Sequence, residues 1–266
     1  SKFFSKKIIV QLRGGNWNNW LKESSFCTKS YVALIMKIPN GGIVLGDSLR
    51  YIFEPYFGKK FTFTVPNGFN LVNKGSKHKN SIFTLLFLAN LQESKGLFQF
   101  LKSIKTLVDK AFIFQANIVG EWRCESFKKK CLSFIDENKL PVQIFCNVHG
   151  ENKYKYFLES DIFVFTPIEQ EGHPWVIIEA LACGLPIISS DKGVIAEYVL
   201  DSENGYIINP NDVNKIVVKI EKLYENNALI KKMGLRSKYI YDTLLKEENL
   251  VNNYKKCFDF VISNEI

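Results

Sequence analysis

The chain has 266 residues, of which 46% are hydrophobic and 23% are charged, and this balance excludes a disordered or collagen-like polymer. At about 150 residues per domain, the length allows one large domain, or one complete domain and part of another. Thirty-five Lys and Arg residues against 27 Asp and Glu residues give a formal net charge of +8, yet only four of the basic residues are Arg. Lys lacks the planar fork that reads base edges, so we expect no nucleic-acid partner and favour a phosphate-bearing ligand or an anionic lipid.

Cysteine and histidine usage bounds the chemistry of a site. The six cysteines are scattered without a C-x-x-C pair, so we expect reduced thiols rather than disulfides. The three histidines lie at no metal-ligand spacing, so no metal site is expected. No hydrophobic run reaches the roughly 18 to 20 residues of a bilayer span, and no signal-peptide pattern is present. A cytoplasmic protein is therefore expected.

Residues 1–69 predict a partial α/β unit. The expected strands are Lys7–Leu12, Ile43–Leu45 and Phe61–Val65, and the expected helices are Trp20–Met36 and Asp47–Tyr56. Three short strands cover little of their own apolar surface, so we interpret this part as an incomplete N-terminal domain of a chain that starts in mid-domain. The polar and basic stretch 70–80 is interpreted as an interdomain linker.

Residues 81–245 predict a complete Rossmann-like domain with a doubly wound parallel sheet. Short β-branched and aromatic runs alternate there with segments of helical period. The expected strands are Ile82–Leu88, Ile113–Val119, Val142–Phe145, Ile162–Thr166, Pro186–Ser190 and Tyr206–Ile208. The expected helices are Lys95–Val108, Glu121–Asn138, His149–Glu159, Pro174–Cys183 and Val194–Val199, followed by Val213–Asn226, Leu229–Tyr241 and Leu250–Ile262. Residues 246–266 are interpreted as a C-terminal helix that packs back on the N-terminal part.

The stretch Ile162–Ser190 carries the most information about a site, because it predicts a strand, a loop, a helix and a second strand. Ligands of an open parallel sheet bind beyond the carboxyl ends of its strands, where this loop lies. A helix that begins near Pro174 would leave the backbone amides of Gly172, His173 and Trp175 free to bind an anion. Taken alone, such a loop is more often an ordinary βα turn.

Glu179 is the one polar residue in the otherwise apolar segment Trp175–Cys183, so its carboxylate is expected to be buried. A buried carboxylate needs a partner, and we expect hydroxyl groups of a ligand, such as a vicinal diol, to supply it. An internal ion pair is the alternative. Glu171 lies at the tip of the preceding loop, where a negative charge also favours the helix N-terminus.

The stretch Phe87–Phe98 repeats the pattern of strand, loop and helix start, with Lys95 at the mouth of the helix. A cation in that place opposes the helix dipole, so it calls for an anion, and a diphosphate is the candidate. A solvated surface lysine is the alternative.

Together these motifs resemble those of the family 4 glycosyltransferases. Glu171 and Glu179 stand at the spacing of the family's E-x7-E signature, and Phe87–Gly96 resembles its donor-phosphate loop. Asn90 stands where that loop usually carries an Arg, and Arg13 stands where the acceptor-side strand end often has a His. The likeness extends over essentially the whole chain. Its further segments are Leu12–Asn16, Val65–Gly68, Ser190–Glu197 and Asn204–Gly205.

The resemblance implies an α/β, GT-B-like fold and a retaining transfer of a sugar from a nucleotide-sugar donor, a UDP- or GDP-sugar, to a glycan or lipid-linked acceptor. The donor diphosphate would lie near Asn90, between Lys95 and the amides of residues 172–175. Glu179 would bind the nucleotide ribose. Glu171 would hold a hydroxyl of the transferred sugar, and together with Lys95 it is the expected catalytic group.

On the acceptor side, the resemblance implies that a turn of Arg13, Gly14 and Gly15 faces the acceptor and the donor sugar. The D-x-D pattern of metal-dependent transferases is absent, so no metal cofactor is expected. The implied role is the biosynthesis of a polysaccharide or a cell-surface glycan.

Other functions remain open at this stage. A sugar-nucleotide-binding module without turnover, or an inactive fragment, is the main alternative. An NAD-dependent enzyme is disfavoured because no G-x-G-x-x-G follows a predicted strand. The basic surplus would also suit peripheral contact with the inner face of the membrane, although the run Lys128–Lys130 is more typical of a solvated helix face.

Overall fold

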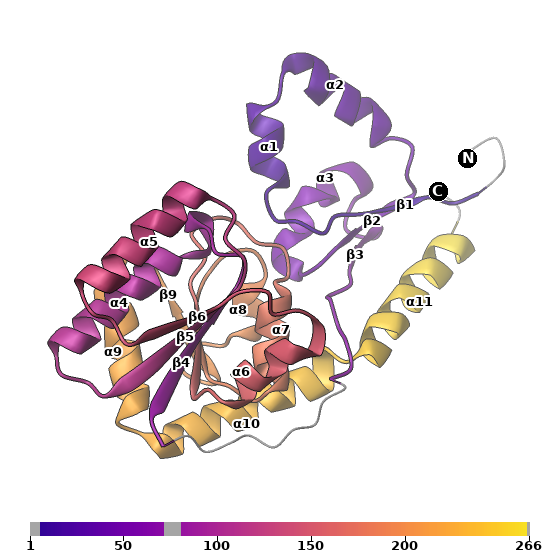
Figure 1. Cartoon of the computed structure of the whole chain (residues 1–266). Helices are drawn as coiled ribbons and strands as arrows, with labels where there is room; N and C mark the ends of the chain where they lie inside the picture. The colour runs from indigo at the N-terminus through magenta and orange to yellow at the C-terminus, as the bar shows by residue number, and fades with distance from the viewer. Residues whose placement is uncertain (1–5, 72–80, 265–266) are drawn as a thin grey trace.

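Two parallel sheets organise the described part of the chain, which comprises residues 6–71 and 81–264 of a computed structural model (Figure 1). The stretch 70–80, interpreted above as a linker, lies mostly outside these residues. Every strand pair in both sheets is parallel. Parallel neighbours need crossover connections, so the alternation of strands and helices follows directly from this pairing.

The N-terminal sheet has the strand order β1-β2-β3. Its unit consists of β1 (Ile9–Gln11), α1 (Trp17–Glu23), α2 (Phe26–Ile35), β2 (Gly41–Val44), the 3₁₀ helix η2 (Asp47–Ile52), α3 (Glu54–Phe57) and β3 (Thr62–Thr64). The prediction of one helix over 20–36 is wrong, because α1 ends at an extended Ser24 and the Ser25 side chain accepts a hydrogen bond from the Thr28 N–H at the start of α2. Short hydroxyl side chains favour such caps over a helix interior.

The larger sheet has the order β6-β5-β4-β7-β8-β9, so the strand order reverses between β4 and β7. Its strands are β4 (Phe83–Leu88), β5 (Phe114–Val119), β6 (Val142–Phe145), β7 (Ile162–Phe165), β8 (Ile187–Ser190) and β9 (Gly205–Ile208). The connecting helices are η3 (Glu93–Lys95), α4 (Leu97–Asp109), α5 (Glu125–Glu137), η4 (Gly150–Lys153), α6 (Tyr154–Leu158), α7 (Trp175–Ala182) and α8 (Ile195–Tyr198). This is the topology of a doubly wound nucleotide-binding sheet, in which a ligand binds where the order reverses.

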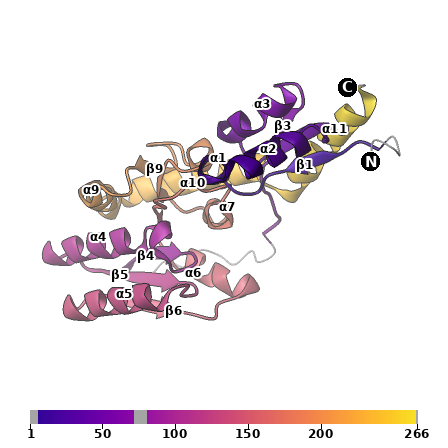
Figure 2. The same cartoon turned by 90° about the horizontal axis from the view of Figure 1, so that it is seen from above.

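Three helices follow the larger sheet, namely α9 (Val213–Tyr224), α10 (Asn227–Leu244) and α11 (Glu247–Ser263). The last of them lies against the N-terminal sheet (Figures 1 and 2). The ring of Phe260 meets those of Phe61 and Phe63 edge-on at 5.7 Å, and the Tyr254 hydroxyl donates a hydrogen bond to the Gln11 side chain at 2.9 Å. The chain therefore returns to its first unit after completing the second.

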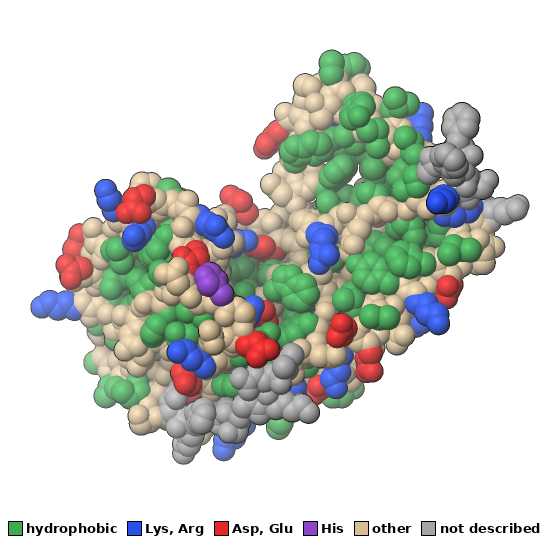
Figure 3. Space-filling view, turned by 45° about the vertical axis from the view of Figure 1, so that its right-hand side comes forward, with side chains coloured by type: hydrophobic (Ala, Val, Ile, Leu, Met, Phe, Trp, Pro, Cys, Tyr) green, Lys and Arg blue, Asp and Glu red, His purple; other side chains and the backbone are tan. Residues whose placement is uncertain are grey.

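The surface of the N-terminal unit is rich in hydrophobic side chains. Helix α2 has no buried residue, and Phe26, Tyr31 and Leu34 are 83%, 64% and 63% exposed. Figure 3 shows hydrophobic side chains gathered over this lobe of the molecule. In the two described ranges no helix combines the length and the apolar composition that crossing a bilayer requires.

We predict that this apolar surface makes the chain self-associate, because burying it removes hydrocarbon from water. Replacing Phe26 and Leu34 together by Ser should lower the average mass that light scattering measures at high protein concentration. Ile113→Ser is the matched control, since Ile113 is 75% exposed on the other unit. A wild-type chain that stays monomeric at every concentration would contradict the prediction.

Candidate functional site

The candidate site lies at the carboxyl ends of β4 and β7, where the strand order reverses. We call it the switch-point site and define it by the loops 89–96 and 166–174. The loop 191–194 after β8 and the turn 12–16 after β1 lie directly against it. Parallel strands bring these segments to one edge although they are far apart in the sequence.

Glu171 and Lys95 meet in this site. The Lys95 ammonium donates a hydrogen bond to Glu171 Oε1 at 2.5 Å, and the two side chains are 22% and 13% exposed. Burial raises the pKa of Glu171, and the hydrogen bond and charge of Lys95 oppose that rise. Lys95 therefore already has an internal anion, so its position at the helix start does not by itself require a diphosphate. Binding of a diphosphate by Lys95 stays a prediction.

Glycine allows two other backbone segments to approach the peptide of Glu171 closely. A Cβ atom at Gly15 or at Gly193 would overlap the carbonyl oxygen of Glu171, and one at Gly172 would overlap the carbonyl oxygen of Arg13. Gly193 also has φ +63°, a conformation that favours glycine. The turn after β1 is thus in direct backbone contact with the loop after β7. Gly14 is different, because nothing lies within 4 Å of a Cβ placed there.

Asn67 links Arg13 to the mouth of α7. Its side-chain oxygen accepts a hydrogen bond from Arg13 Nη2 at 3.2 Å, and its side-chain nitrogen donates to the carbonyl oxygen of His173 at 3.0 Å. The Asn67 backbone N–H also donates to His173 Nδ1 at 3.2 Å. Burial lowers the pKa of His173 to about 3, so the imidazole is neutral and carries its proton on Nε2. Sequence reasoning did not single out Asn67 as a functional group.

The start of α7 presents free backbone donors. The N–H groups of Gly172, His173 and Trp175 make no hydrogen bond to any described residue, and Pro174 has no N–H to offer. The Trp175 side chain is 43% exposed and lies edge-on to Phe69, at 6.1 Å between ring centroids. Three unused donors at the positive end of a helix suit an anion.

Glu179 is buried in α7, as its surroundings predicted, but it has an internal partner. Lys153, at the end of η4, donates to Glu179 Oε1 at 2.6 Å. The expectation that a ligand must supply the partner is therefore wrong, and the internal ion pair named as the alternative is present. Burial raises the pKa of Glu179, and Lys153 opposes that rise. The other oxygen, Oε2, is buried and has no hydrogen-bond partner within the described ranges.

Asn90 faces a residue that the sequence did not point to. Its side-chain oxygen accepts hydrogen bonds from Arg123 Nε at 3.2 Å and from Arg123 Nη2 at 2.9 Å. Arg123 follows β5, and no spacing rule connects it with a loop 33 residues earlier. Only the pairing of β4 with β5 brings the two side chains together.

Two further features lie outside this arrangement. Among residues 6–71 and 81–264, no three His, Cys, Asp or Glu side chains are grouped as a metal ion would require.

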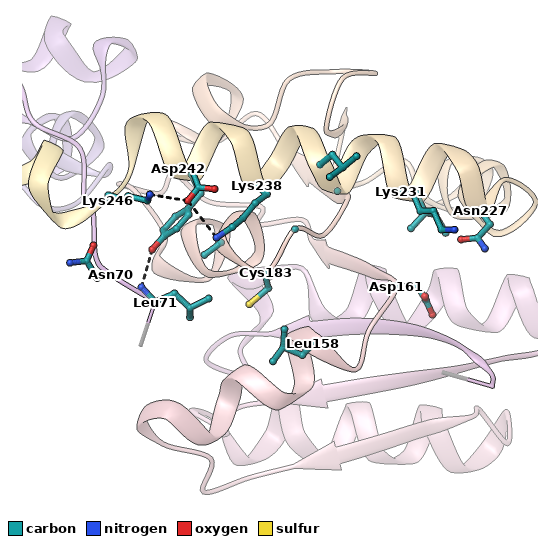
Figure 4. Close-up of a pocket in the computed structure, with 16 residues that line it drawn as sticks. Asn70, Leu71, Leu158, Asp161, Cys183, Asn227, Lys231, Lys238, Asp242 and Lys246 are labelled. Atoms are coloured by element: carbon teal, nitrogen blue, oxygen red, sulfur yellow. Dashed lines mark hydrogen bonds and ion pairs between the residues drawn. The ribbon is translucent and has the colours of Figure 1, made fainter. Parts of the chain in front are cut away.

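A cavity of about 1150 Å³ opens at the opposite end of the strands, beside Leu158, Asp161 and Cys183 (Figure 4). None of the predicted site residues lines it, and it borders Leu71, next to the undescribed stretch 72–80.

We predict that Lys153→Met destabilises the protein by about 3–5 kcal/mol at pH 7, because it leaves the Glu179 carboxylate buried and unpaired. Burial raises the pKa of Glu179 above its ordinary 4.5, so the stability that this group contributes is present below pH 4.5 and is lost as the pH rises through the folded-state pKa. Losing Lys153 raises that pKa further, so the cost should grow from pH 4 to pH 7.

Urea unfolding at both pH values measures this cost. Adding Glu179→Gln to Lys153→Met should recover most of the loss. Lys110→Met, which removes a surface ion pair with Glu221, serves as the control. An equal cost at pH 4 and pH 7 would show that the lysine acts through packing alone.

Known proteins share this sequence and fold. The model of the family "Glycosyl transferases group 1" matches residues 72–239. The capsular polysaccharide biosynthesis glycosyltransferase CapM of Staphylococcus aureus is 27% identical over 165 residues, which cover 62% of this chain and 42% of CapM. The chain spans about half the length of the curated relatives it matches.

Solved structures share the fold at low sequence identity. A glycosyltransferase from Rickettsia africae superposes with a TM-score of 0.84 at 17% identity, covering 99% of this chain and 73% of the other. HepE of Anabaena, solved in complex with UDP and glucose, gives a TM-score of 0.78 at 15% identity, with coverage of 99% and 73%. The predicted α/β, GT-B-like fold is confirmed, and the chain belongs to the group 1 family of glycosyl transferases.

Proposed function

We propose that this chain is the nucleotide-sugar-binding part of a retaining, E-x7-E glycosyltransferase of family 4, which moves a sugar from a nucleoside diphosphate sugar to a glycan or lipid-linked acceptor. One observation carries the proposal: within residues 6–71 and 81–264, three backbone N–H groups at the start of α7 and just before it have no hydrogen-bond partner, and neither has one carboxylate oxygen of Glu179 farther along the helix. The first set suits a diphosphate, and the second suits a ribose hydroxyl. A nucleoside diphosphate offers both groups on one molecule.

The diphosphate would bind at the amides of Gly172, His173 and Trp175, with Lys95 beside them. Lys95 uses one of its three N–H donors on Glu171, so two remain for phosphate oxygens. These groups would stabilise the charge that builds on the leaving group during transfer. No metal is part of the proposal, because amide and ammonium donors serve this purpose.

The ion pair also sets the role of Glu171. Lys95 holds the carboxylate at the contact between the two units, and its second oxygen would accept a hydrogen bond from a hydroxyl of the transferred sugar. The side chain is largely buried, so such a bond would form in a low dielectric and would be strong. We assign it a positioning contact with the sugar and no nucleophilic step.

The acceptor would approach along the turn of Arg13, Gly14 and Gly15. This turn touches the donor loop through Gly15 and Gly172, so donor sugar and acceptor would meet where water has little room. Arg13 is held by Asn67, which fixes the direction of its guanidinium. CapM is named for capsular polysaccharide biosynthesis, and this supports an acceptor in a cell-surface glycan. A cytoplasmic reaction at the inner face of the membrane remains a prediction from the basic surplus.

We predict that Glu179→Ala removes a contact with the ribose, whereas Lys95→Ala removes a contact with the diphosphate. Glu179→Ala should lower the affinity for uridine and for UDP, or for guanosine and for GDP, by a similar factor of about tenfold, because a charged hydrogen bond to ribose is lost. Lys95→Ala should lower the affinity for the nucleoside diphosphate by about tenfold and leave the affinity for the nucleoside unchanged. Calorimetric titration of both series measures this, with a thermal melt of each variant as the control for folding. Wild-type protein that binds neither UDP nor GDP would contradict the proposed function.

We further predict that Gly15→Ala lowers the rate of sugar transfer by about tenfold to 100-fold, because the new methyl group forces the acceptor turn away from Glu171. Gly14→Ala is the matched control, since its Cβ would enter open space and should leave the rate nearly unchanged. Release of UDP or GDP from a panel of sugar nucleotides, with glycan and lipid-linked acceptors, provides the assay. Equal rates in both variants would remove the turn from the mechanism.

The same assay decides between the enzyme and its alternative. Nucleotide binding without transfer to any acceptor would favour a non-catalytic sugar-nucleotide-binding module. The Lys95–Glu171 ion pair is the observation that keeps this alternative in view, because each expected catalytic group neutralises the other in the absence of ligand.

A further inference from the structure

We propose that Arg123 is a phosphate-binding residue of the switch-point site and supplies a guanidinium to the donor diphosphate from the loop after β5. The inference rests on the proposed function and deepens it, because it adds a cation that neither the resemblance nor any sequence spacing assigned. Lys95 would then be one of two cations that bind the diphosphate.

The backbone fixes Arg123 to the loop that carries Lys95. Strands β4 and β5 are parallel neighbours, and their pairing continues past the strand ends as a bridge between Leu91 and Trp122. The Arg123 N–H donates to the carbonyl oxygen of Leu91 at 3.3 Å. Arg123 therefore stands at the same edge of the sheet as the switch-point site, in a place that the loop 89–96 determines.

The side chain of Arg123 is oriented without being neutralised. Its Nε and Nη2 atoms both donate to the Asn90 side-chain oxygen, and this leaves three of its five N–H donors unused by that contact. The oxygen belongs to a neutral amide, so the guanidinium keeps its full charge. Asn90 thereby holds a planar cation in one orientation, which suits bidentate binding of phosphate.

The carboxylates on the loops after β4 and β5 and at the start of α5 have other partners. They are Glu93 with Lys130 at 3.3 Å, Glu125 with Lys128 at 3.7 Å, and Glu121 with the backbone N–H of Asn147. Lys95 is paired with Glu171. Of the two cations on the loops after β4 and β5, Arg123 is thus the one that has no carboxylate partner in the described ranges. An incoming anion could therefore pair with the Arg123 guanidinium without breaking an existing ion pair.

The test measures binding of pyrophosphate, of UDP and GDP, and of uridine and guanosine to four proteins: wild type, Arg123→Gln, Asn90→Asp and Arg236→Gln. Arg123→Gln should lower the affinity for pyrophosphate and for the nucleoside diphosphate by about tenfold or more, and should leave the affinity for the nucleoside unchanged. Asn90→Asp should lower the affinity for the same ligands, because a carboxylate at position 90 neutralises the Arg123 guanidinium. Arg236→Gln is the matched control and should have no effect, since Arg236 lies on α10 and pairs with Glu203 in the turn before β9.

Each outcome decides one question. Unchanged affinity for pyrophosphate and nucleoside diphosphate in Arg123→Gln, while Lys95→Ala lowers both, would overturn the role of Arg123 and leave the proposed function intact. An equal loss for nucleoside and diphosphate would also overturn it, because Arg123 would then act by supporting the loop. Wild-type protein that binds no nucleoside diphosphate would overturn the proposed function instead, and pyrophosphate would still show whether Arg123 binds phosphate.

Discussion

The whole arrangement depends on the close approach of two backbones at the carbonyl group of Glu171. Glycine at positions 15 and 193 removes the side-chain atoms that would otherwise fill this space, so segments from both units reach the same peptide. The loop after β7 is therefore held between its own sheet and the N-terminal unit. Because Lys95 then fixes the Glu171 side chain, the charged groups of the site lie where the two units touch.

Two buried carboxylates give the site its electrostatic character. Each is paired with a lysine from another loop, and in each case burial raises the carboxyl pKa more than the lysine lowers it. Buried ion pairs contribute little net stability, although breaking one is costly. The ion pairs Lys95–Glu171 and Lys153–Glu179 therefore fix the orientation of the two carboxylates. In the part of the chain that the structure describes, Glu179 Oε2 and the N–H groups at the start of α7 have no hydrogen-bond partner.

Membership in the group 1 family and the geometry of the site support the same class of chemistry by separate routes. The family rests on a match over residues 72–239, whereas the site rests on amides, carboxylates and cations that converge at one edge of the sheet. The N-terminal unit contacts this edge through Arg13 and Asn67, and the hydrogen bonds of Asn67 to His173 join the turn 12–16 to the mouth of α7. The position of that turn is thus coupled to the free amides.

The sequence by itself determined the alternation of strands and helices and the burial of Glu179, because hydrophobic period and helix composition are local properties; the predicted strand Val142–Phe145 coincides with β6. It did not determine the break at Ser24 and Ser25, where capping overrode a long apolar run. Only the tertiary structure decided the partners. Lys153 and Glu179 are 26 residues apart, Asn90 and Arg123 are 33 apart, and Lys95 and Glu171 are 76 apart. Such pairs depend on which strand ends become neighbours in the sheet, and no local pattern encodes that order.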